Sequence, residues 1–286
     1  MRVEEFKVQK SKKLFEIISS RLNLSYNQIQ KIFRNKDVKV NGKRVNADLQ
    51  LLPGDEVVVY YREKQKLNLE IIYQDENLVV VFKKRNIETI AENGESLQTE
   101  LSKQLNRECF AVHRLDRNTE GLVVFALNNE SKNELDAAFK NRTIDKFYLA
   151  LVFGNLRKKE DVLSAYLKKD AKKSLVYIND TLEKGYEKII TKYKVLKNEN
   201  NLSLLEVKLV TGKTHQIRAH LAHIGHFIIG DEKYGDSKIN KQYKKRYQCL
   251  CAYKLKFAFG TDSKLNYLNN TVIELEKEKI EFCQNL

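Results

Sequence analysis

The chain has 286 residues, 42% of them hydrophobic, four cysteines and a formal net charge of +14. This hydrophobic content excludes wholesale disorder, no apolar run is long enough to span a membrane, and the cysteines are too few and scattered for a disulfide scaffold. We therefore expect a cytoplasmic protein of about two domains, whose excess positive charge predicts a polyanionic partner. Nucleic acid is the leading candidate. An acidic membrane surface is the weaker one, because no basic amphipathic anchor stands out, and we expect no membrane partner.

Residues 1–62 are the more densely basic end of the chain, with a net charge of +6. Apolar residues recur at helical spacing in Leu14–Leu22 and again in residues 29–33, which predicts two short helices. Asn41 and Gly42 then predict a two-residue hairpin turn, because both central positions of such a turn need a positive φ. The pattern indicates a helix pair followed by a small hairpin sheet.

Residues 11–61 resemble the S4 RNA-binding domain. The resemblance rests on the helix pair, the basic run through Lys36, the segment VKVNG at 38–42, and Gly54 and Asp55 before a valine-rich strand. It implies an RNA-binding domain over residues 1–62, and the contacts that it implies fall on Lys13, Arg21, Gln28, Lys31 and Lys36. The segment departs from the S4 pattern at two places. Residues 13–15 read Lys-Leu-Phe where Arg-Leu-Asp is usual, and the Gly that is usual near Asp37 is absent. An ordinary solvated lysine face is the alternative interpretation.

A polar, charged stretch at residues 63–68 predicts a linker, and residues 69–286 predict a second domain. Helices are expected at residues 96–105 and 131–140, the latter opened by a capping box of Ser131 and Glu134. Strands are expected at residues 69–73, 78–82, 122–127, 146–153, 186–196, 203–210, 250–259 and 271–275. Because strands outnumber helices and several neighbours lack a crossover helix, the pattern favours an α+β fold with a mixed or antiparallel sheet.

The first group of candidate catalytic and binding residues lies in the segment HRLDRNTEG at residues 113–121. Arginine is scarce in this chain, yet Arg114 and Arg117 flank Asp116 closely. An aspartate between two guanidinium groups stays ionised at neutral pH, so it could act as a nucleophile or a base. The flanking cations could hold phosphates. The alternative is a structural ion pair in a loop.

The second group lies at residues 212–235, which hold four of the five histidines. They predict a helix whose buried stripe is formed by Ile217, Leu221 and Ile224. His215 and Arg218 share a different face, from which Arg218 could reach an active-site carboxylate. His220 and His223 are spaced to ligate a metal, but no neighbouring Cys or acidic residue completes a zinc pattern. We expect these two histidines to pack the helix or face RNA, and we expect no metal.

Together these segments closely resemble the RluA-type pseudouridine synthases. The matches are HRLDRNTEGLVVFAL at 113–127, KFYLA at 146–150 and TGKTHQIRAHLAHIGHFIIGDEKYG at 211–235. The resemblance implies an isomerase that needs no cofactor and converts uridine to pseudouridine in RNA. The chain resembles the subgroup that carries an S4 domain, which implies uridines of large-subunit ribosomal RNA as the substrate.

The resemblance also implies roles for particular residues. Asp116 matches the aspartate that attacks the uridine and allows C1′ to pass from N1 to C5. Tyr148 matches the tyrosine that stacks in the pocket and is a candidate for removing a proton, and Arg218 matches the arginine that pairs with the aspartate. Arg114 matches the arginine that enters the space left by the extruded base, while Arg117 and His215 are expected to contact the substrate RNA.

The chain departs from the family pattern at several positions. Residues 83–86 read KKRN where Lys-Pro-x-Gly is usual, although Asn86 tolerates a left-handed backbone, so we expect the turn to persist. Glu120 replaces a usual Ser, Lys213 a usual Arg and Phe227 a usual Pro. These departures bear on substrate choice more than on reaction type.

Two other functions remain open from the sequence. One is a non-catalytic RNA-binding or ribosome-assembly factor that retains the fold, and the other is a metal-dependent hydrolase built on the histidine cluster. Ribosomal RNA is the expected substrate, transfer RNA is the alternative, and a monomer is the default expectation.

Overall fold

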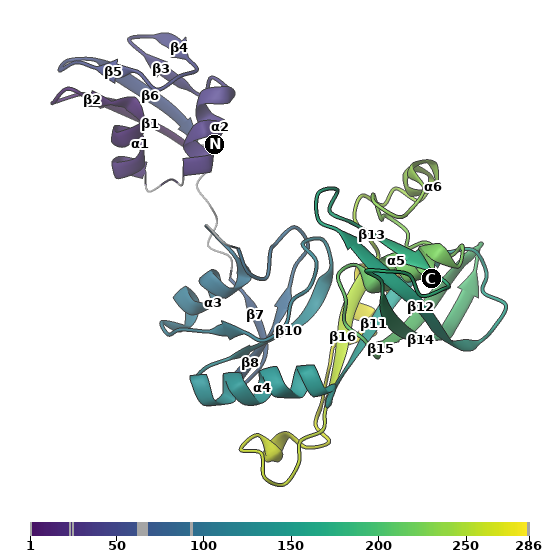
Figure 1. Cartoon of the computed structure of the whole chain (residues 1–286). Coiled ribbons are helices and arrows are strands. Elements are labelled where there is room, and N and C mark those ends of the chain that lie inside the picture. The colour runs from purple at the N-terminus through teal and green to yellow at the C-terminus, as the bar shows by residue number, and fades with distance from the viewer. Residues whose placement is uncertain (1, 23, 25, 62–67, 92–93, 285–286) are drawn as a thin grey trace. The chain divides into compact units, whose positions relative to one another are not determined.

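The computed structural model describes residues 2–22, 24, 26–61, 68–91 and 94–284 (Figure 1). The chain forms two compact units, Met1–Leu67 and Asn68–Leu286, called unit 1 and unit 2 below. Residues 62–67 lie outside the described residues, and they include five of the six residues of the predicted linker, 63–68. Among the described helices, none has the length and apolar character of a membrane-spanning segment.

Unit 1 consists of two helices and a four-stranded antiparallel sheet in the order β1-β6-β3-β4, with a separate short pair, β2-β5. Its elements are β1 (Arg2–Lys7), β2 (Lys12–Lys13), α1 (Leu14–Leu22), α2 (Tyr26–Arg34), β3 (Val38–Val40), β4 (Lys43–Val45), β5 (Gln50–Leu51) and β6 (Glu56–Tyr61). The predicted hairpin turn is confirmed, because Asn41 and Gly42 have φ values of 48° and 78°. The apolar faces of both helices, with Ile18 and Ile29 fully buried, pack against Val38 and Val59 of the sheet.

Unit 2 is built on one eleven-stranded sheet. Nine strands follow the order β13-β12-β14-β15-β11-β16-β10-β8-β7, while β17 pairs with β16 and β9 with β10. The helices and strands are β7 (Glu70–Gln74), β8 (Leu78–Lys83), α3 (Leu97–Leu105), β9 (Phe110–Ala111), β10 (Glu120–Ala126), α4 (Asn129–Asn141), β11 (Ile144–Phe153), β12 (Glu160–Asp170), β13 (Leu175–Asn179), β14 (Glu187–Glu199), β15 (Leu202–Leu209), α5 (Gln216–His223), α6 (Ser237–Gln242), β16 (Leu250–Phe257) and β17 (Val272–Glu274), with short 3₁₀ turns at Asn266–Leu268, Lys277–Lys279 and Glu281–Cys283.

The sheet is mixed because β10 and β16 pair in parallel, whereas the other described pairs of unit 2 are antiparallel. Gly121 makes this contact possible. A Cβ atom there would lie 2.2 Å from the carbonyl oxygen of Ala252, and its φ of +126° disfavours any other residue. The parallel contact joins the two halves of the sheet directly after the Asp116 loop, residues 112–119.

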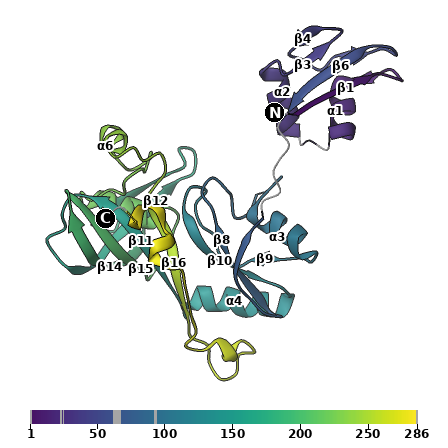
Figure 2. The same cartoon turned by 180° about the vertical axis from the view of Figure 1, so that it is seen from behind.

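Helices α3 and α4 cover opposite faces of β8 and β10 (Figures 1 and 2). The alternation of side chains along a strand explains this layering. Val79 and Val81 pack in the same cluster as Leu97 and Leu101 of α3. The intervening residues of the same strands pack against Leu135 and Ala138 of α4. Strands β8 and β10, the second of which directly follows the Asp116 loop, are therefore buried on both faces.

Some expected details were wrong. Helix α4 begins earlier than predicted, and its N-cap is Asn128, whose side chain accepts a hydrogen bond from the Ser131 backbone. Glu134, the other half of the predicted capping box, instead binds Ser263 and Lys264. The hairpin of β12 and β13 was not predicted, because β12 begins and ends with charged residues and β13 is only five residues long.

Candidate active site

Asp116 lies in the loop that connects β9 to β10, and this loop is fixed from several directions. Its own carbonyl accepts a hydrogen bond from the Thr119 backbone at 3.0 Å. Leu115 exchanges two hydrogen bonds with the buried hydroxyl of Thr89. The fully buried ammonium group of Lys83 donates to the carbonyl of Arg117 at 3.0 Å. The backbone on both sides of Asp116 is therefore held in place.

Arg218 joins two carboxylates from different parts of unit 2. Its Nη1 donates to Oδ2 of Asp116 at 2.9 Å, while Nε and Nη2 form a bidentate pair with Asp231 at 2.7 and 2.9 Å. Asp231 is completely buried, whereas the Asp116 side chain is 25% exposed. Burial alone would lower the pKa of Arg218, but the two carboxylates outweigh it and raise that pKa. Arg218 is therefore a permanent cation that ties Asp116 to a buried anchor.

His215 also lies near the carboxylate of Asp116 and is itself bound to Tyr234. Its Nε2 is 3.9 Å from Oδ2 of Asp116, and its Nδ1 is 2.8 Å from the hydroxyl of Tyr234. Burial, opposed by Asp116 and aided by Arg218, lowers the pKa of His215 to about 4. His215 is therefore a neutral imidazole near pH 7.

Tyr148 comes from β11 and lines the same cleft as Asp116. Burial raises the pKa of Tyr148, and the negative charge of Asp116 raises it further. Its hydroxyl is therefore protonated at physiological pH. A neutral phenol can stack or donate a hydrogen bond, but it is a poor proton acceptor.

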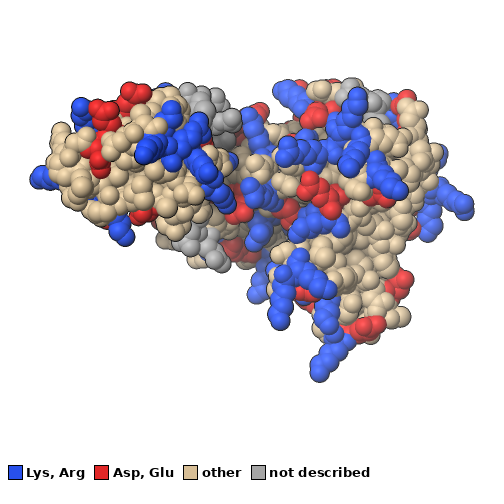
Figure 3. Space-filling view, turned by 90° about the horizontal axis from the view of Figure 1, so that it is seen from above, with Lys and Arg blue, Asp and Glu red and all other residues tan. Residues whose placement is uncertain are grey.

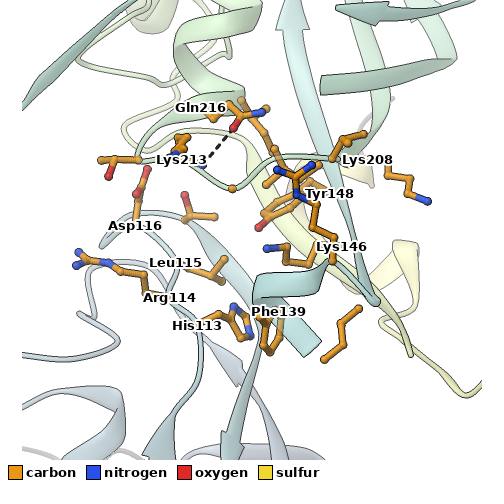
Figure 4. A pocket seen from close by; sticks show the side chains of 18 of the residues that line it. His113, Arg114, Leu115, Asp116, Phe139, Lys146, Tyr148, Lys208, Lys213 and Gln216 are labelled. Carbon is orange, nitrogen blue, oxygen red and sulfur yellow. Dashed lines mark hydrogen bonds between the residues drawn. The ribbon is translucent and has the colours of Figure 1, made fainter. Parts of the chain in front are cut away.

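These residues surround a cleft of about 700 Å³. Figure 4 shows Asp116 and Arg114 on one side of it, facing Tyr148 and Lys146. The cleft is strongly basic, since its lining holds three aspartates against the cations Arg114, Lys140, Arg142, Lys146, Lys192, Lys208, Lys213 and Arg218. Lys and Arg also cover more of the viewed face of unit 2 than Asp and Glu do (Figure 3). A volume and charge of this kind suit a nucleotide with its flanking phosphates.

The structure gathers most of the residues predicted for the site in unit 2. Asp116, Tyr148, Arg218, Arg114 and His215 all line the cleft. Arg117 is not among the lining residues. Its side chain is exposed, and its backbone carbonyl accepts a hydrogen bond from Lys83.

The five predicted RNA contacts of the N-terminal segment all lie in unit 1. Lys13, Arg21, Lys31 and Lys36 are exposed, and Gln28 is half-buried. The guanidinium of Arg21 also lies over the ring of Phe6, 4.7 Å from its centroid. These cations are accessible to a phosphate backbone.

Sequence reasoning missed Asp231, Tyr234 and the role of Lys83. The first two lie within the segment GDEKYG, and the available signal was that a buried Arg218 needs a second anion. Lys83 donates hydrogen bonds to three carbonyl oxygens, and burial lowers its pKa to about 8. The sequence alone gives no signal for this role, because a lysine at the end of a buried strand can be identified as a donor to backbone carbonyls only when those carbonyls are located.

Two of the departures from the family pattern, at residues 83–86 and at Glu120, have local explanations. Asn86 adopts a φ of 63°, which confirms that the turn persists without glycine. Glu120 forms an ion pair with Arg85 at 2.8 Å, and Arg85 also binds Glu281 near the C-terminus. The replacement at 120 therefore anchors the loop at 84–87 to the start of β10.

The histidine cluster forms hydrogen bonds within the fold. His220 is buried and contacts the hydroxyl of Thr191 at 3.0 Å, and His223 contacts Asp180 at 2.8 Å. Among the residues that the structure describes, no group of three or more His, Cys, Asp or Glu could hold a metal ion. The spacing of His220 and His223 is thus accounted for by these contacts.

A family model, two relatives and a solved structure that resemble this chain are all described as pseudouridine or pseudouridylate synthases. A family model described as RNA pseudouridylate synthase matches residues 71–223. The chain is 33% identical to the ribosomal large subunit pseudouridine synthase C of Rickettsia conorii, over 87% of this chain and 93% of that protein. It is 32% identical to the protein of the same name from Rickettsia bellii, over 76% of this chain and 80% of that protein. Human RNA pseudouridylate synthase domain containing 1 shares the fold, with a TM-score of 0.59 and 22% identity over 79% of this chain and 98% of that one.

Proposed function

Because the chain belongs to the RNA pseudouridylate synthase family and is therefore an RNA isomerase, we propose that it converts specific uridines of large-subunit ribosomal RNA to pseudouridine, with Asp116 as the nucleophile. The RNA class is suggested by the names of the two Rickettsia relatives. The nucleophile is suggested by the geometry around Asp116.

One observation carries the assignment of Asp116. Its Oδ2 is bound by Arg218, while among the described residues no hydrogen bond reaches its Oδ1. A carboxylate that lines a cleft, with one oxygen held and the other without a hydrogen-bond partner among the described residues, is prepared for nucleophilic attack. The reaction breaks the bond from C1′ to N1 and forms a bond from C1′ to C5. The bond that the Asp116 carboxylate forms to the nucleoside breaks again and regenerates the free carboxylate, while C5 loses a proton to solvent and N1 gains one. The atoms balance without a cofactor.

Other residues take roles that fit their positions. The neutral, buried ring of Tyr148 suits stacking on the base better than removing the C5 proton. Arg114 is exposed beside Asp116 and could fill the stack from which the uridine is withdrawn. A cleft that holds a single nucleotide requires the base to be turned out of its helix, which costs least in single-stranded or bulged RNA.

We assign unit 1 the role of an S4-like RNA-binding domain that adds affinity through phosphate contacts. Replacing Lys13, Lys31 and Lys36 together with Ala should reduce the slope of log affinity against log salt by roughly 0.7–0.9 for each lost phosphate contact. The turnover number should change little, because none of these residues lies in unit 2. An unchanged salt slope would indicate that this lysine face is only solvated.

The direct test uses RNA labelled with tritium at C5 of uridine. Release of label from large-subunit ribosomal RNA is expected with the wild-type chain, and transfer RNA tested in parallel decides between the two substrate classes. Asp116→Asn and Asp116→Ala should abolish release. Asp262→Asn, in an exposed loop, is the matched control and should leave it unchanged. RNA binding without release on any transcript would instead identify a non-catalytic RNA-binding or ribosome-assembly factor.

A further inference from the structure

A chain of hydrogen bonds ends at the imidazole of His215. The backbone amide of Val176 in β13 donates to the hydroxyl oxygen of Tyr234 at 2.9 Å. That hydroxyl lies 2.8 Å from Nδ1 of His215. The ring of Tyr234 is held in turn by Arg218, whose guanidinium carbon lies 5.3 Å from the ring centroid. Tyr234 is therefore fixed between a strand, a histidine and an arginine.

The direction of these bonds decides which nitrogen of His215 carries the proton. The Tyr234 oxygen already accepts from Val176, so its own proton is free to be donated. Among the described residues, His215 Nδ1 is the acceptor within reach of that proton. A neutral imidazole that accepts at Nδ1 must carry its hydrogen on Nε2. The Nε2–H group is the one on the side of Asp116.

The charges around Asp116 leave room for a second donor. Arg218 is one cation, yet it faces two carboxylates, and its bidentate contact is with Asp231. Among the described residues, the carboxylate of Asp116 receives a single hydrogen bond, from Nη1. One contact on Oδ2 leaves the carboxylate free to rotate about its own bond, so the direction of Oδ1 is not fixed by Arg218 alone.

We propose that His215 is a positioning residue whose Nε2–H donates a second hydrogen bond to Oδ2 of Asp116 when substrate enters the cleft. This proposal rests on the proposed function of Asp116. The separation of 3.9 Å must shorten by about 1 Å to form a hydrogen bond, a tightening that is common when a catalytic site binds its substrate. Two donors on Oδ2 then direct Oδ1 toward the nucleoside. Tyr234 and the Val176 amide act through His215 by holding its tautomer.

Two substitutions of His215 separate the two nitrogens. His215→Gln places an amide N–H near the position of Nε2, whereas His215→Asn places an acceptor near Nδ1 and leaves nothing at Nε2. His215 has a φ of +53°, and Asn tolerates that conformation best among residues other than Gly, so backbone strain does not explain a loss in the Asn variant.

We expect His215→Asn to lower kcat for tritium release about 10- to 100-fold, the effect of losing a hydrogen bond to a charged group, with KM nearly unchanged. His215→Gln should recover most of that loss. The same pair of changes at His223, which lies at the end of α5 and binds Asp180, is the control and should leave kcat unchanged. Equal kcat values for the Asn and Gln variants of His215 would overturn the proposal.

The tautomer can be measured without any RNA. The chain has five histidines, so long-range ¹H–¹⁵N correlation spectra of the full chain are simple, and the signals absent from His215→Gln identify residue 215. The wild-type spectrum should show the Nε2–H tautomer, and Tyr234→Phe should convert it to a mixture. An Nδ1–H tautomer in the wild type would contradict the proposal. If wild-type protein released no tritium from any RNA, the proposed function would fail, while the spectra would still report on the tautomer.

Discussion

Replacing Asp231 should mainly lower the free energy of unfolding, whereas replacing Asp116 should mainly abolish catalysis. The Arg218 side chain is 7% exposed and that of Asp231 is fully buried, with two hydrogen bonds between them. Burial would raise the pKa of Asp231, but Arg218 outweighs it and lowers that pKa, so the pair is ionised at neutral pH. Asp231→Asn keeps an oxygen for the backbone amides of Lys233 and Tyr234 but turns an N–H group toward the Nε–H of Arg218.

Breaking one partner of a buried ion pair costs about 3–5 kcal/mol, which is the loss of unfolding free energy expected for Asp231→Asn. Asp116 is 25% exposed and makes one hydrogen bond to an arginine that retains its other partner. Asp116→Asn should therefore cost at most about 1 kcal/mol, while it abolishes catalysis. Asp231→Asn should also reduce kcat, because Arg218 loses its anchor.

Urea unfolding followed by circular dichroism measures both losses, and hydrogen exchange in β11 reports on unit 2 separately from unit 1. Asp262→Asn serves again as the surface control. Equal losses for the two variants, or a loss below about 1 kcal/mol for Asp231→Asn, would refute the view that Asp231 anchors Arg218.

Three further outcomes are expected from the fold around the site. Burial, with a smaller effect of Lys146, lowers the pKa of His113 to about 3, so between pH 6.5 and 5 only the unfolded chain binds this proton and stability falls by up to about 2 kcal/mol. Urea unfolding at both pH values should show a smaller fall in the free energy of unfolding for His113→Gln than for the wild type. An equal fall would contradict the lowered pKa of His113. Lys83→Met strands three carbonyl acceptors and should cost about 2–4 kcal/mol in the same assay, whereas wild-type stability would show that water replaces the ammonium group. Gly121→Ala forces a Cβ against the backbone of β16 and should prevent folding or lower the melting temperature by more than about 5 °C, whereas Gly260→Ala, with open space around it, should be neutral; similar melting temperatures for the two would contradict the close approach.

Much of the fold was predictable because local patterns agreed with the final packing. Helix α1 and strands β8 and β10 have periodic or continuous apolar residues, and these residues are buried. The Asn41 turn and the left-handed Asn86 follow from the conformational range of asparagine. The hairpin of β12 and β13 was missed because charged residues stand at both ends of β12 and because the five residues of β13 are too few to show a clear alternation.

The sequence by itself determined the reaction class and the chemical character of the site, since the order and composition of its motifs are local properties of the chain. The distance between Asp116 and Arg218, which are 102 residues apart, was decided only by the sheet that brings the β9–β10 loop to helix α5. The positions of Asp231 and Tyr234, on which the proposed tautomer of His215 rests, were likewise decided only by the tertiary structure. A hydrogen bond has a direction and a partner, and for groups distant in sequence both are fixed only when the tertiary structure places them within about 3 Å.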